Sequence, residues 1–136
     1  MRGLLRFATV ASGLTLTVFA GSETPLRQAP ARSADLINPL GGDERTCRAG
    51  AKLYIRECAA CHGTRGEGYH RALPLTAPEV RHASTGALFW VITHGSLRRG
   101  MPSFAHLPEP QRWQIVEYLK SGDFRSGSNP HCQRNP

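Results

Sequence analysis

The chain has 136 residues, which leaves room for one domain together with processed or extended ends. Its 17 Lys and Arg against 10 Asp and Glu give a formal charge of +7. A charge of this size can indicate nucleic-acid binding, but neither a basic helix nor a mixture of basic and aromatic residues accompanies it, so we exclude that class. The charge then serves solubility or docking to an acidic protein partner.

Residues 1–20 are typical of a secretory signal peptide. Arg2 and Arg6 form the positive region, residues 7–20 carry no charge, and Ala20 ends a small-x-small cleavage site. The uncharged run is short for a membrane span, although an uncleaved signal would act as an anchor. We therefore expect a periplasmic or otherwise exported protein, in a compartment where disulfides form.

The remaining chain divides into three parts. Residues 21–42 have little periodicity and several Pro, Gly and Ser residues, which predicts a flexible leader. Residues 123–136 predict a flexible C-terminal tail of the same kind. The folded domain is expected at 43–122, where no strand-like alternation is found, so the fold class is all-α with about three main helices.

The first helix is predicted from an N-cap at Asp43 to about residue 60. Gly50, Tyr54 and Cys58 recur every four residues and therefore share one face of this helix. Residues 62–80 are expected to be irregular because they contain several glycines and prolines.

A second helix is predicted from a cap at Ser84 or Thr85 to His94, with Gly95 as its stop. The last helix begins near Glu109 and stops at Gly122. Its expected packing residues are Trp113, Ile115, Val116, Tyr118 and Leu119.

The motif that predicts function is Cys58-Ala59-Ala60-Cys61-His62. Its C-x-x-C-H spacing indicates covalent attachment of one haem, in which both thiols add to vinyl groups and His62 becomes an axial iron ligand. A redox dithiol and half of a zinc site are the alternatives for a C-x-x-C pair. The adjoining histidine and the export signal favour haem.

Met101 is the predicted second axial ligand. The sequence has two methionines, and Met1 belongs to the signal peptide. Met101 stands in the segment Gly100-Met101-Pro102, which is a poor core helix or strand but suits a loop that directs a thioether sulfur at iron. The competing interpretations are a core methionine and a histidine ligand. His94 is the strongest of the histidine candidates, which also include His70, His82, His106 and His131.

Taken together, these motifs resemble those of a class I c-type cytochrome, the small monohaem bacterial type, over residues 43–122. The resemblance rests on the Gly50, Tyr54 and Cys58 spacing, the Gly63, Gly66 and Gly68 run after the haem histidine, Pro74, and the Gly100–Phe104 loop. It implies a cytochrome c-like fold in which Gly50 lets the terminal helices cross closely. It also implies that the carbonyl of Pro74 accepts the His62 ring N–H.

The implied function is electron transfer by a periplasmic carrier that cycles one haem c between ferrous and ferric states. Because His62 and Met101 would fill both axial positions, we expect no enzyme activity. The expected partner is a redox protein such as a respiratory complex, an oxidase or a periplasmic dehydrogenase. The alternatives are a permanent cytochrome subunit of a dehydrogenase or oxidase complex, and an enzyme or gas sensor in which Met101 detaches from iron.

Cys47 and Cys132 lie outside the haem motif and form an even pair in an oxidising compartment. Because the terminal helices of the family cross, the tail could reach back, so the resemblance allows a Cys47–Cys132 disulfide. Two free thiols or a bridge to a partner chain are the alternatives.

Overall fold

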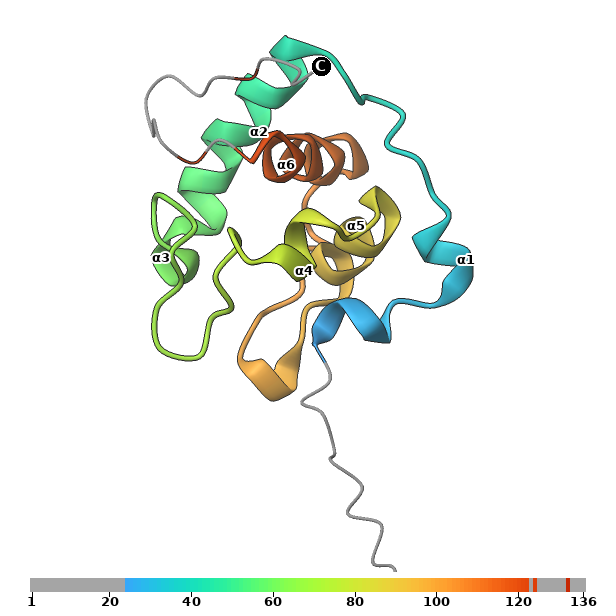
Figure 1. Ribbon diagram of the computed structural model, residues 1–136. Coiled ribbons are helices and arrows are strands. Elements are labelled where there is room, and N and C mark those ends of the chain that lie inside the picture. The colour runs from blue at the N-terminus through green and yellow to red at the C-terminus, as the bar shows by residue number, and fades with distance from the viewer. Residues whose placement is uncertain (1–23, 123, 125–131, 133–136) are drawn as a thin grey trace, which may run out of the picture.

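The computed structural model describes residues 24–122 together with Phe124 and Cys132 (Figure 1). The predicted signal peptide lies outside these residues. The elements in chain order are η1 (Pro25–Gln28), α1 (Ala31–Ala34), α2 (Glu44–Glu57), α3 (Ala59–His62), α4 (Pro78–Arg81), α5 (Thr85–His94), η2 (Leu97–Arg99) and α6 (Glu109–Ser121). Within the described residues the only strand-like pairing is one isolated bridge between Ser96 and Met101, so the all-α prediction is confirmed.

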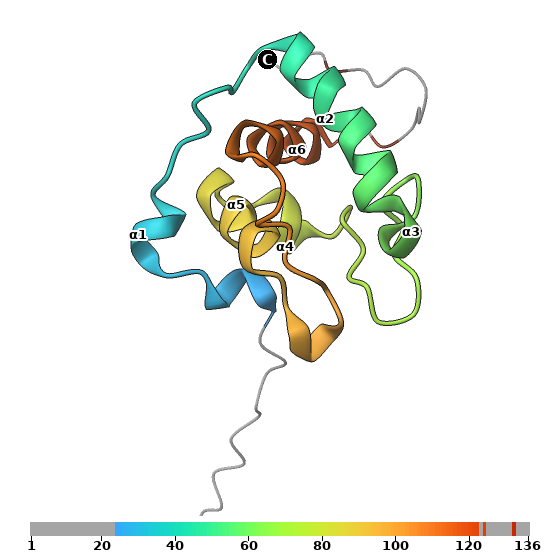
Figure 2. The same ribbon diagram turned by 180° about the vertical axis from the view of Figure 1, so that it is seen from behind.

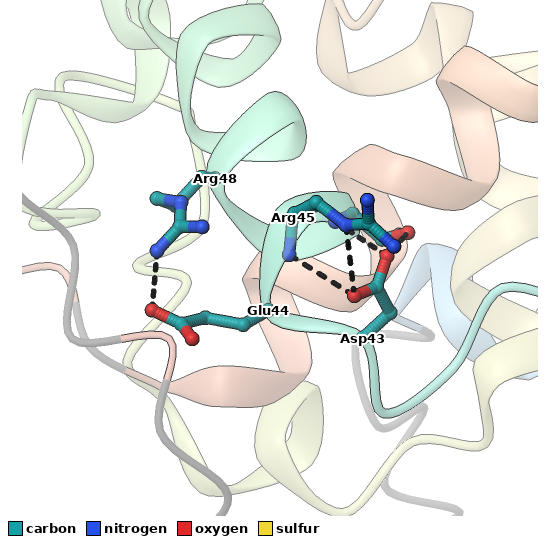
Figure 3. Close-up of polar contacts among 5 residues, drawn as sticks. Asp43, Glu44, Arg45 and Arg48 are labelled. Atoms are coloured by element: carbon teal, nitrogen blue, oxygen red, sulfur yellow. Dashed lines mark hydrogen bonds and ion pairs between the residues drawn. The ribbon is translucent and has the colours of Figure 1, made fainter.

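Helix α2 begins where the sequence predicted, because Asp43 caps it (Figure 3). The Asp43 carboxylate accepts hydrogen bonds from the backbone N–H groups of Arg45 and Thr46, both at 3.3 Å. These are two of the four donors that a helix N-terminus leaves unpaired. Arg48 also pairs with Glu44 one turn earlier, which adds a small stabilisation on the exposed face.

Helices α2 and α6 cross at close range, and both views show them side by side (Figures 1 and 2). Gly50 makes this approach feasible. A Cβ placed on Gly50 would lie 1.9 Å from the carbonyl oxygen of Gln114 and 3.0 Å from the Cβ of Tyr118. The prediction that Gly50 lets the terminal helices cross closely is confirmed.

Helix α5 packs on α6 and has the predicted boundaries. Ser84 is its N-cap and accepts a hydrogen bond from the N–H of Ala87 at 3.2 Å, and Gly95 ends the helix with a φ of +73°. Phe89 stacks on Trp113 of α6 with ring centroids 3.9 Å apart. These apolar contacts hold α5 against α6.

Residues 24–42, which we expected as a flexible leader, instead follow a defined course against the domain. Asn38 is buried, and its side-chain amide donates to the Trp113 carbonyl and to the Glu117 carboxylate, each at 3.1 Å. Elements η1 and α1 both pack on α5. The leader is held because its polar groups find partners in helices that are distant in sequence.

The tail prediction falls largely outside the described residues, but its two described positions are both attached to the domain. Phe124 is buried and forms an aromatic cluster with Tyr54 and Tyr118, with ring centroids 5.6 Å and 5.5 Å away. The Cys47–Cys132 disulfide is present and joins α2 to the tail. Among the described residues, no helix is long and apolar enough to cross a membrane.

Candidate functional site

A cavity of about 360 Å³ lies between α2, the segment after it, α5 and the Met101 loop. Its walls are mainly apolar, with Leu73, Leu88 and Ile92 among them. The residues predicted from the sequence all line this cavity, namely Cys58, Cys61, His62 and Met101. The fold therefore brings side chains separated by about 40 positions together in one apolar space.

Cys58 and Cys61 are placed by the junction of α2 and α3. Cys58 is the C-cap of α2, its backbone N–H bonded to the Tyr54 carbonyl at 2.8 Å, and Cys61 lies one turn further in α3. Both are free cysteines. Burial, with smaller contributions from Glu57 and Cys61, raises the pKa of the Cys58 thiol to about 12.

His62 ends α3 and is oriented by a backbone carbonyl. Its Nδ1 lies 3.0 Å from the carbonyl oxygen of Leu73. Because a carbonyl only accepts, Nδ1 must carry the proton, which leaves the lone pair of Nε2 for a metal. Burial lowers the pKa of His62, partly opposed by that hydrogen bond, and so favours the neutral, ligating imidazole.

The acceptor for His62 differs from the expectation by one residue. The resemblance implied the carbonyl of Pro74, whereas the structure has the carbonyl of Leu73. Proline restricts the residue before it to extended geometry, and this fixes the Leu73 carbonyl beside the imidazole. Pro74 therefore acts on His62 indirectly, through the conformation of its neighbour.

Met101 is held by a tight backbone loop. Ser96 and Met101 exchange two backbone hydrogen bonds, of 2.9 Å and 3.1 Å, which close the loop that contains η2. Gly95 and Gly100 make the loop geometry accessible, with φ values of +73° and +78°. A Cβ on Gly95 would lie 2.6 Å from the Met101 carbonyl oxygen, so only glycine fits there.

Most of the other candidate histidines lie away from the cavity. His94 is exposed, stacks on Trp90 and is not part of the cavity wall. His82 and His106 are exposed and also lie away from the cavity, and His131 falls outside the described residues.

His70 is the histidine that does line the cavity. It adopts a left-handed backbone conformation, with a φ of 52°. His70 is exposed like His82, His94 and His106, but it lines the cavity and they do not. His70 therefore replaces His94 as the histidine rival to Met101.

The alternative chemistries of the cysteine pair fit the site less well. A redox dithiol needs a thiol pKa lowered toward neutrality, whereas burial raises the pKa of Cys58. A structural zinc site needs four ligands, and no group of three or more His, Cys, Asp or Glu residues suited to a metal occurs in the part of the chain that the structure describes. Two thiols, an imidazole with its Nε2 lone pair, a thioether and apolar walls fit a c-type haem.

Two features of the site were not predicted from the sequence. Pro25 and Leu26, in the leader, line the cavity beside the expected residues. Tyr54 donates a 2.5 Å hydrogen bond to the carbonyl of Gly63, directly after His62. The four-residue spacing placed Tyr54 near the site but did not predict which group its hydroxyl would bond. Nothing in the pattern of residues 21–42 indicated that the leader would contact the cavity.

The all-α fold and this cavity define a small haem-binding electron-transfer domain, and the comparisons with known proteins identify its family. Residues 45–119 match the family described as cytochrome C oxidase, cbb3-type, subunit III. The chain therefore belongs to this c-type cytochrome family. Its cofactor class is haem c, and its chemistry is electron transfer.

A curated relative supports the same assignment. The chain is 37% identical over 97 residues to the quinohemoprotein alcohol dehydrogenase ADH-IIG of Pseudomonas putida. The match covers 68% of this chain but 13% of the relative. The relative is thus a much longer protein, of which one part resembles this cytochrome domain.

Proposed function

We propose that the protein is a periplasmic monohaem electron carrier. Cys58 and Cys61 bind the haem covalently, and His62 and Met101 are its axial ligands. The observation that carries this proposal is the convergence of these four side chains on one apolar cavity. When bound, the haem supplies a one-electron ferrous/ferric couple.

Each residue of the site has a distinct task in this proposal. The thiols of Cys58 and Cys61 fix the position of the macrocycle. The hydrogen bond from His62 to Leu73 orients the imidazole and strengthens it as a ligand. The closed loop after Gly95 keeps the Met101 thioether in place, and the apolar walls exclude water. With both axial positions filled, no position remains for a substrate, so we propose that the protein is not an enzyme.

Covalent attachment is tested by extraction. Acid–acetone treatment of the purified protein should leave the haem on the polypeptide, and mass spectrometry should show one haem per chain beginning near Gly21. The mass also tests whether residues 1–20 are cleaved. The double variant Cys58→Ala, Cys61→Ala should carry no covalent haem. Extractable haem, or zinc in its place, contradicts the proposal.

The sixth ligand is tested by spectroscopy. The oxidised protein should show the weak near-infrared charge-transfer band of a sulfur–iron bond, and Met101→Ala should remove it and allow carbon monoxide to bind the reduced protein quickly. His70→Ala and His94→Ala serve as matched controls that should keep the band. If His70→Ala alone changes the ligand spectrum, His70 is the ligand. Rapid carbon monoxide binding by the unmodified protein would instead favour a sensor or enzyme.

A specific observation also favours the alternative of a cytochrome subunit. The relative from Pseudomonas putida is by its name an alcohol dehydrogenase that contains haem, and the match covers a small part of it. A separate chain with this domain could serve a dehydrogenase as a permanent subunit. Size-exclusion chromatography of native extract distinguishes the two: a free carrier elutes as a small monomer, whereas a subunit elutes with a large partner.

The rim of the cavity suits an acidic redox partner. Arg71 and Arg99 line the cavity against one carboxylate, that of Glu57, and Leu97 near Arg99 is 86% exposed. An apolar contact with basic neighbours complements an acidic docking surface. The electron-transfer rate should therefore fall as ionic strength rises, and Arg98→Glu, next to Leu97, should weaken docking. A rate independent of salt would contradict this mode of docking.

A further inference from the structure

The leader is built into the wall of the functional cavity. We call residues 24–42 the strap. Pro25 is buried, Leu26 is half-buried against the hydrophobic core, and both line the cavity that Cys58 and Met101 also line. The strap thus supplies apolar side chains to the same space that the proposed haem ligands enclose.

The middle of the strap is attached to α5. The Thr85 hydroxyl donates to the Leu36 carbonyl at 2.9 Å. The strap also passes so close to Gly86 that a Cβ there would lie 1.9 Å from the Ser33 carbonyl oxygen and 2.9 Å from that of Leu36. Gly86 is therefore a docking point for the strap, since any side chain at this position would displace the strap backbone.

The C-terminal end of the strap is attached to α6. Besides the two bonds of Asn38 to Trp113 and Glu117, the backbone N–H of Gly42 donates to the Glu117 carboxylate at 2.7 Å. None of the residues that make these attachments lines the cavity. The attachments hold the strap along a fixed path that leads Pro25 and Leu26 to the cavity wall.

The strap lies outside the segment that matches the family, which is residues 45–119. The contacts of the strap within this chain are the guide to its role.

We propose that the strap shields the haem from water and thereby raises its reduction potential. This inference rests on the proposed function, because it requires haem in the cavity. The ferric form carries one more positive charge than the ferrous form, and a low dielectric disfavours that charge. Solvent exposure is one of the levers by which a protein sets a haem potential. By covering one side of the cavity, Pro25 and Leu26 also limit the entry of small ligands.

The test uses three variants of the full-length holoprotein. Leu26→Ala opens the cavity wall, Gly86→Ala displaces the strap without altering a cavity residue, and Gln28→Ala is the matched control at an exposed position of η1. Redox titration should give a more negative midpoint potential for Leu26→Ala and Gly86→Ala than for the unmodified protein. Imidazole should bind their ferric forms faster, and Gln28→Ala should leave both quantities unchanged.

The outcomes separate this inference from the proposed function. Gly86→Ala also improves helix propensity in α5, so its helical circular dichroism should remain native while the potential shifts. Haem-loaded Leu26→Ala and Gly86→Ala with unchanged potential and imidazole kinetics would overturn the shielding role and leave electron transfer intact. Unmodified protein that binds no haem would overturn the proposed function itself.

Discussion

Asp43 holds the start of α2 through a side chain that is exposed to water. Its carboxylate accepts from two backbone N–H groups and from the Thr46 hydroxyl at 3.1 Å. The Thr46 hydroxyl bond and the two backbone bonds lower the pKa of Asp43, against an opposing effect of desolvation. Because the folded pKa lies below the unfolded value, this stability is present above the unfolded pKa and is lost as pH falls through the folded pKa.

We therefore expect Asp43→Ala to lower the thermal midpoint at neutral pH, since the cap is lost. Asp43→Asn should retain most of the stability, because asparagine is an equally good N-cap. The Asp43→Asn variant should also lose less stability at acidic pH than the unmodified protein, because it has no carboxylate at this position to protonate. Thermal unfolding of the three proteins at neutral and acidic pH checks this. Equal acid sensitivity in Asp43→Asn and the unmodified protein would contradict the assignment.

Tyr54 shows how a fully buried hydroxyl is satisfied next to the site. Burial is the main cause that raises its pKa, so the hydroxyl remains a donor to the Gly63 carbonyl at physiological pH. The same carbonyl also accepts from the N–H of Gly66 at 3.3 Å. Removal of the Tyr54 hydroxyl therefore leaves the Gly63 oxygen one partner.

Tyr54→Phe should for this reason cost about 1 kcal/mol of unfolding free energy, the net value of one hydrogen bond, rather than the larger penalty of an orphaned carbonyl. The matched control is Tyr69→Phe, whose hydroxyl bonds the exposed Glu67 at 3.1 Å and should matter little. Urea unfolding measures both. A loss in Tyr54→Phe no greater than in Tyr69→Phe would refute the role of the Gly63 bond.

At the scale of elements, the crossing of α2 and α6 is the contact that organises the domain. A side chain at Gly50 would meet the backbone of Gln114, with the carbonyl carbon 2.6 Å from its Cβ. Backbone cannot move aside as a flexible side chain can, so the two helices would have to separate. Gly50 is required for this close packing, whereas at Gly122 an added Cβ would meet no atom within 4 Å and glycine is favoured by the φ of +66° instead.

Gly50→Ala should destabilise the protein by roughly 2 kcal/mol, because overpacking outweighs the gain in helix propensity of about 1 kcal/mol. Lys52→Ala, on the exposed face of the same helix, is the control and should be close to neutral. Chemical denaturation of both variants provides the measurement. A Gly50→Ala variant as stable as the control would mean that the helices do not cross this closely.

The helix boundaries could be predicted because their signals are local. Asp43, Ser84, Gly95 and Gly122 each act within one turn of the helix that they start or end. The strap could not be predicted, since its anchor Asn38 bonds residues 75 and 79 positions away and leaves no periodic pattern in the sequence.

The candidate site divides in the same way. Spacing alone identified Cys58, Cys61 and His62 as a group, and the chemistry of its loop identified Met101. The Leu73 acceptor depends on the course of an irregular segment, where a shift of one residue changes which carbonyl faces the imidazole. The cavity contacts of Leu26 depend on tertiary attachment of the leader. Local chemistry could therefore be predicted from the sequence, whereas long-range partners could not.

At the scale of the whole molecule, the two ends of the described chain are both tied back to the helices between them. The strap is held by hydrogen bonds and close packing, whereas the tail is held by Phe124 and by the Cys47–Cys132 disulfide. This matters because a domain of this size buries a limited hydrophobic core, and small domains gain stability from covalent links. The haem thioethers would connect two cysteines that are close in sequence and would close no long loop.

The disulfide closes a loop with a sequence separation of 85 residues, which includes α2, α5 and α6. In the chain-entropy account, a link of this length restricts the unfolded chain enough to stabilise the fold by about 4.5 kcal/mol. The double variant Cys47→Ser, Cys132→Ser should lose stability of that order in urea unfolding, and a double change avoids a single thiol that could form dimers. Phe124→Ala with the disulfide intact separates tail packing from the covalent link.

Thiol counting on the denatured, unreduced protein should find no reactive pair, because both haem cysteines would be thioethers. Two reactive thiols per haem, or a double variant as stable as the unmodified protein, would show that the link does not form in solution.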